Sequence, residues 1–363
     1  MRIALTAGGT FGHLFPAFSV YEAFSQLPGG PHEVRFFGPD ERGERSAVEA
    51  RGIRFVAVPA AQIRGRGPLQ LARNLVKLAW GIGIAVRRLR AFHPAVVLST
   101  GGYGSFPCCV AARILRRPLV VYLPDVSPGW AVRAEQRLAT RMATTAQAAL
   151  AFLPRAKTRV TGYPVRTSFF TQDRAAARAA LGYAASDSVL VIAGASQGAQ
   201  AINRAVWGAL PALAGAGVHT VHLTGAADLA EAESQKATLG PNARLYTPAA
   251  FRDDLPTLMV AADLGVMRAG ASVLGEVPAA ALPAVFVPGT FAGAHQRDNA
   301  RWLTDAGAGL VLEEADLAQF EETVLALLRD DARLGRMRAA AAALAQPNAA
   351  FSIATLLVEV AKT

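Results

Sequence analysis

The sequence predicts an α/β fold built from two doubly wound sheets of parallel strands. Apolar, β-branched runs alternate with Ala-, Leu- and Arg-rich helical patterns along the chain, and this alternation restarts near residue 188. Several runs are uninterrupted, which is typical of parallel strands covered by helices on both faces. The expected strands are Arg2–Ala7, Val34–Phe37, Phe55–Val58, Ala95–Ser99, Leu119–Tyr122, Val189–Gly194, His219–Leu223, Leu264–Val266 and Ala284–Val287. Expected helices include Gln70–Arg90, Arg174–Leu181 and Leu317–Leu328.

The chain divides into two predicted domains of opposite charge. Its 363 residues are too many for one ordinary domain and suit two. Residues 1–165 contain 22 Lys or Arg and eight Asp or Glu, a net charge of +14, whereas residues 166–363 contain 15 and 19, a net charge of −4. The change falls in the loop Gly162–Arg166. We therefore expect domains at 1–160 and 166–345, with a ligand cleft between them at the carboxyl ends of the strands.

Composition excludes several classes of protein. Hydrophobic residues make up 52% of the chain and charged residues 18%, which excludes wholesale disorder. The two cysteines, Cys108 and Cys109, are adjacent and cannot build a disulfide framework, which favours a reducing compartment. The chain begins directly with a predicted strand instead of a basic leader and an apolar core, so we expect no secretion.

The basic first half indicates a polyanionic partner: nucleic acid, an anionic membrane surface or a phosphate-rich substrate. Within residues 64–90, the stretch Leu75–Val86 is apolar apart from Lys77, and it is flanked by Arg64, Arg66, Arg73, Arg87, Arg88 and Arg90. A bilayer span needs about 20 apolar residues, so this segment is too short. It predicts an interfacial helix on anionic lipid, a helix packed on the first sheet, or both. Nucleic-acid binding ranks last because no recognisable nucleic-acid motif is present.

Three glycine-rich loops each follow a predicted strand and precede a helix: Ala7–Pro16, Ser99–Ser105 and Gly194–Gln200. Glycine lets the backbone approach a ligand closely, and a helix N-terminus presents unpaired N–H groups to an anion. No loop carries a Walker motif or fits the dinucleotide fingerprint, and ordinary tight turns are the simpler alternative. Two such loops in one half and one in the other predict two phosphorylated ligands. His13 lies where the first loop enters its helix, so we predict that it is a catalytic base.

A second polar cluster lies in the latter half. Arg268 follows a predicted strand and Glu276 comes about two helical turns later. A carboxylate there suits the two hydroxyls of a ribose, and an arginine suits a diphosphate. Downstream, the loop His295–Asn299 predicts contacts with sugar hydroxyls, with an ordinary surface turn as the alternative. His222 and His295 are the next histidines after His13 that we expect to contact a ligand.

Taken together, these segments resemble the MurG family of peptidoglycan N-acetylglucosaminyltransferases, which act on lipid-linked muramyl pentapeptide. The matching residues occur in the family's order: Gly8-Gly9-Thr10, Gly12-His13, Pro16, Gly101-Gly102-Tyr103, Gly162, Pro164-Val165-Arg166, Ser196-Gln197-Gly198-Ala199, Phe251, Asp253-Asp254, Arg268, Gly270-Ala271, Glu276, His295-Gln296 and Asn299-Ala300. The resemblance implies a GT-B fold, in which two doubly wound Rossmann-like domains face a central cleft. It also implies that residues 346–363 form a C-terminal helix returning to the first domain.

The resemblance further implies a role for each matching residue. His13 would be the base, and the 166–345 domain would bind UDP-N-acetylglucosamine. Residues expected at the donor are Thr10, Gly12, Arg166, Ser196, Gln197, Gly198, Phe251, Arg252, Arg268, Ala271, Ser272, Glu276, His295 and Gln296. Residues expected at the acceptor, in the 1–160 domain, are Gly9, Thr10, Gly101, Gly102, Tyr103 and Asp125, and the loops Gly8–His13 and Gly101–Gly104 would receive its diphosphate.

The chain departs from the family pattern mostly on or beside the acceptor side. Phe11 replaces a small residue, Tyr122-Leu123-Pro124-Asp125 stands where His-Glu-Gln-Asn is common, Tyr163 replaces Asn, and Gln200 replaces Arg. These departures leave the identity of the acceptor open.

The implied activity is transfer of N-acetylglucosamine from UDP to a polyprenyl-diphosphate-linked muramyl pentapeptide, with inversion, at the cytoplasmic face of the cell membrane. Residues 64–90 would bind the anionic membrane surface peripherally. No cofactor or metal is expected to be required, and a divalent cation would be dispensable. The alternatives are a related transferase with another lipid or small-molecule acceptor, a UDP-N-acetylglucosamine epimerase, and a non-catalytic sensor or assembly factor.

Overall fold

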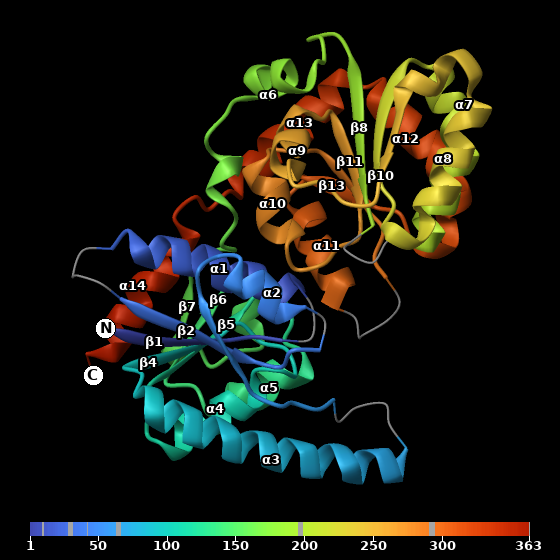
Figure 1. Ribbon diagram of the computed structural model, residues 1–363. Helices are drawn as coiled ribbons and strands as arrows, with labels where there is room; N and C mark the ends of the chain where they lie inside the picture. Colours follow the sequence, from blue (N-terminus) through green and yellow to red (C-terminus); the bar gives the residue numbers. More distant parts are fainter. Residues whose placement is uncertain are drawn as a thin grey trace. The chain divides into compact units, whose positions relative to one another are not determined.

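The protein consists of two compact α/β units, seen here in a computed structural model. It describes residues 1–8, 11–27, 32–41, 43–62, 67–194, 199–289 and 295–362. One unit comprises Met1–Val165 together with Asn348–Thr363, and the other comprises Arg166–Pro347. Each contains one twisted sheet with helices on its faces (Figure 1). Every strand pairing in the described part of the chain is parallel.

The first unit has a seven-stranded sheet in the order β3-β2-β1-β4-β5-β6-β7. Its strands are β1 (Arg2–Thr6), β2 (Glu33–Gly38), β3 (Arg54–Ala57), β4 (Val96–Ser99), β5 (Leu119–Leu123), β6 (Arg141–Thr144) and β7 (Thr158–Val160). The order reverses between β1 and β4, whose last residues, Thr6 and Ser99, are paired. In sheets of this kind, ligands bind at the carboxyl ends of the strands beside such a reversal.

Two apolar cores cover the two faces of this sheet. The helices are α1 (Phe11–Ser25), α2 (Glu44–Glu49), α3 (Pro68–Phe92), α4 (Phe106–Ile114), α5 (Trp130–Glu135) and α14 (Ala349–Ala361). Helices α1, α2 and α14 pack on one face, and α3, α4 and α5 on the other (Figure 1). Helix α14 contributes the fully buried Ile353 and Leu357 to the same core as Leu14 of α1. Residues near the C-terminus therefore complete the N-terminal unit.

The second unit repeats the plan with a six-stranded sheet in the order β10-β9-β8-β11-β12-β13. Its strands are β8 (Ser188–Ala193), β9 (Val218–Leu223), β10 (Tyr246–Ala249), β11 (Leu264–Met267), β12 (Ala284–Phe286) and β13 (Gly309–Val311). Its helices are α6 (Arg174–Leu181), α7 (Gln200–Gly215), α8 (Leu229–Thr238), α9 (Leu255–Ala261), α10 (Val273–Ala279), α11 (His295–Asp305), α12 (Phe320–Leu328) and α13 (Asp331–Ala343). The reversal lies between β8 and β11.

The fold class predicted from the sequence is confirmed: both sheets are parallel and doubly wound, and all nine expected strands are present. Helix α6 shows how local sequence sets an element. The Asp173 carboxylate accepts the N–H of Ala176 at 2.8 Å and begins the helix, and Gly182 ends it at a φ of +78°. Four strands were not expected, namely β6, β7, β10 and β13. In the part of the chain that the structure describes, none of the helices has both the length and the apolar character to cross a bilayer.

Candidate active site

In the first unit, two of the predicted glycine-rich loops pack backbone against backbone at the reversal of the sheet. A Cβ added to Gly102 would lie 1.7 Å from the carbonyl oxygen of Gly8, and one added to Gly8 would lie 2.8 Å from the Cα of Gly104. Gly102 also has a φ of +87°, which side chains rarely adopt. Glycine is required here because no other residue fits between the loops.

His13 stands in the first turn of α1 and is tied to the second loop. Its Nδ1 lies 3.1 Å from the carbonyl oxygen of Thr100, and the Thr100 hydroxyl donates to the His13 carbonyl at 2.6 Å. A carbonyl can only accept, so the proton of the neutral ring is on Nδ1 and the lone pair is on Nε2. This is the tautomer that a base needs.

Some of the other residues predicted at the acceptor lie near His13, in the loop after β4. Gly101 and Gly102 form the loop after β4, but the Gly101 N–H donates inward to the Ser99 hydroxyl at 3.1 Å. The Tyr103 hydroxyl donates to Glu41 at 3.1 Å, and Glu41 also pairs with Lys77 of α3 at 2.8 Å. Asp125 is half-buried and follows β5, the neighbour of β4. Gly12 is in the first turn of α1, while Gly9 and Thr10 lie outside the described residues.

A buried carboxyl group beneath this loop was missed by the sequence analysis. Glu135, at the end of α5, has no exposed surface, and the hydroxyls of Ser99 and Ser105 lie 2.8 and 2.6 Å from its two oxygens. Burial raises the pKa of Glu135 to about 7. In the sequence, Arg133, Gln136 and Arg137 stand close to it, as they would to a solvent-exposed residue. Only the serines at the two ends of the loop hinted at a partner.

In the second unit, the segment after β10 brings together several predicted donor residues. The ring of Phe251 is 61% exposed, which suits stacking on a planar base. The Arg252 side chain is paired with Asp254, with its Nε 2.8 Å from an Asp254 carboxylate oxygen. Arg166 donates to the Asp253 carbonyl at 3.2 Å. The Arg252 side chain is therefore paired within this segment.

Arg268 follows β11 as expected, but its side chain runs inward. It is only 7% exposed, donates to the Val287 carbonyl at 3.2 Å and forms an ion pair of 2.6 Å with Glu314. The sequence analysis did not single out Glu314. The guanidinium therefore stands at the end of the strand with its charge already balanced within the unit.

Glu276 lies in α10, half-buried, beside Ser272 and Arg166. Burial raises the pKa of Glu276, while a hydrogen bond with Ser272 and the charge of Arg166 lower it. Ala271 and Ser272 are half-buried in the turn that leads into this helix. These contacts place three of the predicted donor residues, Glu276, Ser272 and Arg166, near one another.

Helix α11 is fastened to the neighbouring loops. The Gln296 amide oxygen accepts the Gly289 N–H at 2.8 Å, and the Asn299 amide donates to the Ala269 carbonyl at 3.0 Å. His295 is the first residue of this helix and is half-buried. The predicted phosphate residues Ser196, Gln197 and Gly198 lie outside the described residues.

The expectation that His222 contacts a ligand is wrong. His222 is fully buried in β9, with Nε2 2.9 Å from the Asn203 amide oxygen and Nδ1 2.9 Å from the Tyr246 hydroxyl. Burial lowers its pKa to about 3. Its imidazole is therefore neutral. Both ring nitrogens have hydrogen-bond partners within the protein, so His222 has a structural role.

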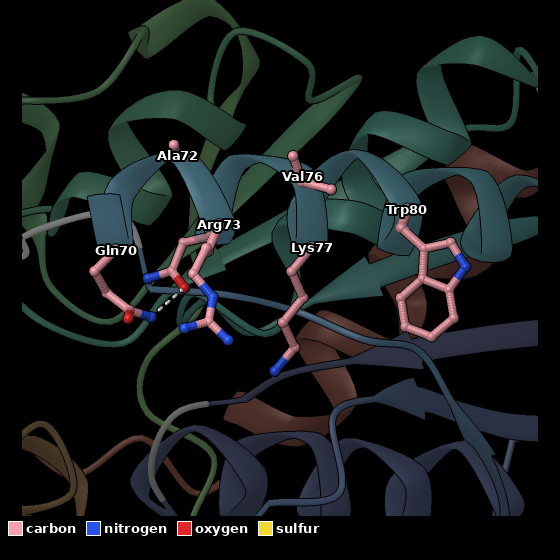
Figure 2. Close-up of a pocket in the computed structure, with 7 residues that line it drawn as sticks. Gln70, Ala72, Arg73, Val76, Lys77 and Trp80 are labelled. Carbon is pink, nitrogen blue, oxygen red and sulfur yellow. Dashed lines mark hydrogen bonds between the residues drawn. The ribbon is translucent and has the colours of Figure 1, made fainter. Parts of the chain in front are cut away.

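Helix α3 contains most of the predicted basic segment and has two different faces. Leu78, Ala85 and Leu89 are buried, whereas Val76 and Trp80 are 71% and 61% exposed. Gln70, Arg73, Lys77 and Trp80 project from one side of the helix, and Ala72 and Val76 project from another (Figure 2). With Asn74 they line an open hollow of about 720 Å³. Arg64 and Arg66 lie outside the described residues.

No three His, Cys, Asp or Glu side chains come together in a way that could hold a metal ion, as far as the described residues extend. Independence from metal ions stays a prediction.

Comparisons with known proteins cover both units. The glycosyltransferase family 28 N-terminal domain matches residues 3–144, and the family 28 C-terminal domain matches residues 188–353. A relative from Acidothermus cellulolyticus, named UDP-N-acetylglucosamine--N-acetylmuramyl-(pentapeptide) pyrophosphoryl-undecaprenol N-acetylglucosamine transferase, is 37% identical over 99% of this chain and 98% of its own length. A relative of the same name from Symbiobacterium thermophilum is 35% identical over 100% of this chain and 97% of its own.

Solved structures share the fold over the full length. The crystal structure of Acinetobacter baumannii MurG has a TM-score of 0.76 at 24% identity and covers 99% of both chains. The UDP-GlcNAc 2-epimerase of Neisseria meningitidis, bound to UDP-GlcNAc, has a TM-score of 0.69 at 14% identity and covers 99% of this chain and 100% of its own. At such low identities these likenesses show the fold alone. The matches in sequence show more: this chain belongs to glycosyltransferase family 28 and, within it, to the MurG family.

Proposed function

We propose that this protein is an inverting glycosyltransferase of peptidoglycan synthesis. It moves N-acetylglucosamine from UDP-N-acetylglucosamine to lipid-linked N-acetylmuramyl pentapeptide, which converts lipid I to lipid II. One observation carries the proposal: relatives that bear the name of this activity are 34–37% identical to the chain over 98–100% of its length.

The second unit is the proposed donor site. Phe251 stacks on the uracil and the Arg252 backbone reads its edge, while the Glu276 carboxylate accepts hydrogen bonds from the ribose hydroxyls. The geometry supports this arrangement because Arg166 joins the two places: it donates to Asp253 in the uracil segment, and its charge acts on Glu276. Ser196, Gln197 and Gly198 hold the phosphates. Ala271, Ser272, His295 and Gln296 complete the site around the sugar.

The first unit is the proposed acceptor site, and His13 is the proposed base. Its Nε2 takes the proton of the acceptor hydroxyl as that oxygen attacks the anomeric carbon, while Nδ1–H stays bonded to the Thr100 carbonyl. The acceptor diphosphate is held by Gly9, Thr10, Gly102 and Tyr103, while Asp125 contacts another part of the acceptor, because a carboxylate repels a diphosphate. Gly101 shapes the loop and does not bind the diphosphate through its N–H, because that N–H donates to the Ser99 hydroxyl.

The displacement breaks the bond between the anomeric carbon and the UDP oxygen, and the electron pair leaves with UDP. The N-terminus of α7 stabilises the charge that develops on the diphosphate. The Arg268 guanidinium adds to this by exchanging its Glu314 partner for the diphosphate. We propose that no metal ion is required for this step, and that a divalent cation is dispensable.

Helix α3 is the proposed contact with the cytoplasmic face of the cell membrane. Its exposed Val76 and Trp80 stand among the exposed cations Arg73, Lys77 and Arg87, a combination suited to the interface of an anionic bilayer. This contact brings the enzyme to the layer that holds its lipid-linked acceptor.

Product analysis tests the proposal. The purified protein is incubated with radiolabelled UDP-N-acetylglucosamine and a short-chain lipid-linked muramyl pentapeptide, with and without EDTA. We expect a β-linked disaccharide product and release of UDP in both conditions. Conversion of the donor without any acceptor would identify an epimerase instead. Transfer to another lipid or to a small aglycone, but not to the muramyl lipid, would identify a related transferase. Binding of UDP-sugar without turnover of any of these acceptors would identify a sensor or assembly factor.

A further inference from the structure

The hydrogen bonds around Ser105 require one more proton than its hydroxyl can supply. Ser105 Oγ lies 2.6 Å from a carboxyl oxygen of Glu135 and 2.7 Å from the carbonyl oxygen of Gly102. Both distances are those of good hydrogen bonds, but a hydroxyl carries a single proton. If Ser105 donates to the Gly102 carbonyl, the proton between Ser105 and Glu135 belongs to the carboxyl group.

The other contacts of Glu135 fit a neutral acid. The Ser99 hydroxyl donates to its second oxygen at 2.8 Å and accepts the Gly101 N–H at 3.1 Å. In a neutral carboxyl group, one oxygen then accepts from Ser99 and the O–H of the other donates to Ser105, so both oxygens have a hydrogen-bond partner. Glu135 thereby reaches both ends of the loop, through Ser99 and Gly101 at one end and through Ser105 and Gly102 at the other.

No cation balances Glu135 in the described residues, where no ion pair includes it. Helix α4 faces it with the Cys108 and Cys109 thiols, and the Cys109 thiol hydrogen-bonds to the carboxyl group of Glu135. Both thiols are neutral partners, because burial raises the pKa of Cys108 to about 12 and that of Cys109 well above its ordinary value. Arg113, at the far end of α4, is exposed. Strand β5 brings Tyr122, whose buried hydroxyl bonds to Thr145, and β4 brings no charged side chain. An ionised Glu135 would be a buried charge surrounded by neutral groups, which is costly.

We propose that Glu135 is a positioning residue for the acceptor loop and fixes the Gly101–Gly102 backbone through a proton on its own carboxyl group. In the neutral form, the carboxyl O–H donates to Ser105 Oγ and the Ser105 O–H donates to the Gly102 carbonyl. When the proton leaves, the Ser105 hydroxyl turns to the carboxylate, and Gly102 keeps only the long N–H bond from Ser105 at 3.3 Å. Gly102 packs on Gly8 and on the ring edge of His13, so this change reaches the proposed base. The inference rests on the proposed function for its catalytic consequence, but not for the protonation itself.

Infrared spectroscopy tests the proton directly. The difference spectrum between wild type and Glu135→Gln is measured across the neutral pH range. We expect a protonated-carboxyl C=O band below pH 7 that belongs to Glu135 and is lost at alkaline pH. Its absence at pH 5.5 would overturn the proposal. This measurement needs no substrate, so it decides the question even if the protein fails to glycosylate the muramyl lipid.

Steady-state kinetics then tests the positioning role. In Glu135→Gln the amide can donate to Ser105 and accept from Ser99, as the neutral acid does, but it cannot ionise. We expect kcat/KM for the acceptor to fall at least fivefold between pH 6.5 and pH 8.5 in the wild type relative to this variant. Ser105→Ala, which cuts the link to Gly102, is expected to lower acceptor kcat/KM at least tenfold at pH 6.5 and to leave the KM for UDP-N-acetylglucosamine within twofold.

Because His13 is unchanged in both variants, any difference between the pH profiles belongs to the Glu135 network. Identical profiles for wild type and Glu135→Gln would overturn the proposal. So would a Ser105→Ala enzyme with wild-type acceptor kinetics. The folded state of each variant is checked by its affinity for UDP, which depends on the second unit, and by its melting temperature, which reports on the whole chain.

Discussion

His13 and Thr100 are joined by two hydrogen bonds that run in opposite directions. The imidazole Nδ1 donates to the Thr100 carbonyl at 3.1 Å, and the Thr100 hydroxyl donates to the His13 carbonyl at 2.6 Å. The pair links the first turn of α1 to the loop after β4, so the ring is oriented by the backbone of a neighbouring strand. A base held in this way needs no reorientation before it removes a proton.

Replacement of His13 by Ala should lower kcat by about 10²–10⁴-fold, the usual contribution of a general base. The affinity for UDP should stay within about twofold, because the proposed nucleotide contacts lie in the other unit. Single-turnover kinetics and titration calorimetry measure the two quantities. Thr100→Val, which replaces the hydroxyl with a methyl group and leaves the bond from Nδ1 to the Thr100 carbonyl in place, serves as the matched control and should retain most of the activity. A His13→Ala enzyme with near-normal turnover would remove His13 from the role of base.

Replacement of Gly102 by Ala should abolish acceptor turnover or unfold the loop. The new Cβ would stand 1.7 Å from the Gly8 carbonyl oxygen, and the φ of +87° would add strain. Gly83 is a suitable control because it is exposed in α3 and nothing lies within 4 Å of its added Cβ. Gly83→Ala should raise the free energy of unfolding by roughly 0.5–1 kcal/mol. Chemical denaturation and acceptor kinetics distinguish the two variants. If Gly102→Ala and Gly83→Ala have the same stability and the same acceptor turnover, the described packing of the loops is wrong.

The Glu135→Gln variant should be more stable than the wild type at alkaline pH. Burial raises the pKa of Glu135 to about 7 in the folded protein, whereas the ordinary pKa of a Glu side chain is 4.5. Between these two values the unfolded chain has lost the proton and the folded chain keeps it, so wild-type stability falls as pH rises through this window and levels off above it. Glutamine does not titrate, so the variant does not lose stability in this way. Across the whole window, the free energy of unfolding of the wild type falls by on the order of 3 kcal/mol relative to that of the variant. Melting temperatures at pH 4 and pH 8 check this, and an equal effect of the substitution at both pH values would refute it.

The double substitution Val76→Glu and Trp80→Glu should reduce binding to anionic vesicles at least tenfold. It removes the apolar side chains that would enter the interface and adds two negative charges. Val311→Glu, in the second unit, is the control because Val311 is also an exposed apolar residue, 38% accessible. Co-sedimentation with phosphatidylglycerol vesicles at two salt concentrations measures the effect. Unchanged binding of the double variant would place the membrane contact elsewhere.

Replacement of Glu276 by Gln should weaken UDP binding by about 10- to 100-fold, because a hydrogen bond to a charged group contributes about 1.5–3 kcal/mol. Affinity for uracil alone should not change, because the base is assigned to Phe251 and Arg252. Titration calorimetry with UDP and with uridine and 2′,3′-dideoxyuridine separates the contribution of the ribose. If both nucleosides lose affinity equally, Glu276 does not hold the hydroxyls.

The sequence was sufficient to predict the fold, because the long apolar strands of parallel sheets stand out from their helical neighbours. Three of the four strands not expected, β7, β10 and β13, lie at sheet edges and lack that signal, whereas β6 lies inside its sheet but has only four residues, one of them Arg141. Strand β7 has three residues, two of them exposed, at the edge of its sheet, and β10 contains Pro248. Short edge strands bury little apolar surface, so pairing with a neighbour defines them more than their own composition does.

The candidate site was predictable where backbone geometry demands a particular residue, as at Gly8 and Gly102. It was not predictable where a role depends on a distant partner. Glu135 comes close to Ser99 only because α5 packs beneath the loop, and His222 is enclosed by Asn203 and Tyr246 from other elements. A sequence pattern carries little information about such long-range pairs.

The placement of α14 makes the second unit an insertion within the first. The polypeptide leaves the first sheet at Val165 and returns to it at Asn348, where α14 closes over α1. During translation the apolar surface of α1, which ends at Ser25, is therefore made more than 300 residues before α14, which begins at Ala349. The unit that starts to form first is therefore completed after its neighbour, and until then the apolar face that α14 covers stays open.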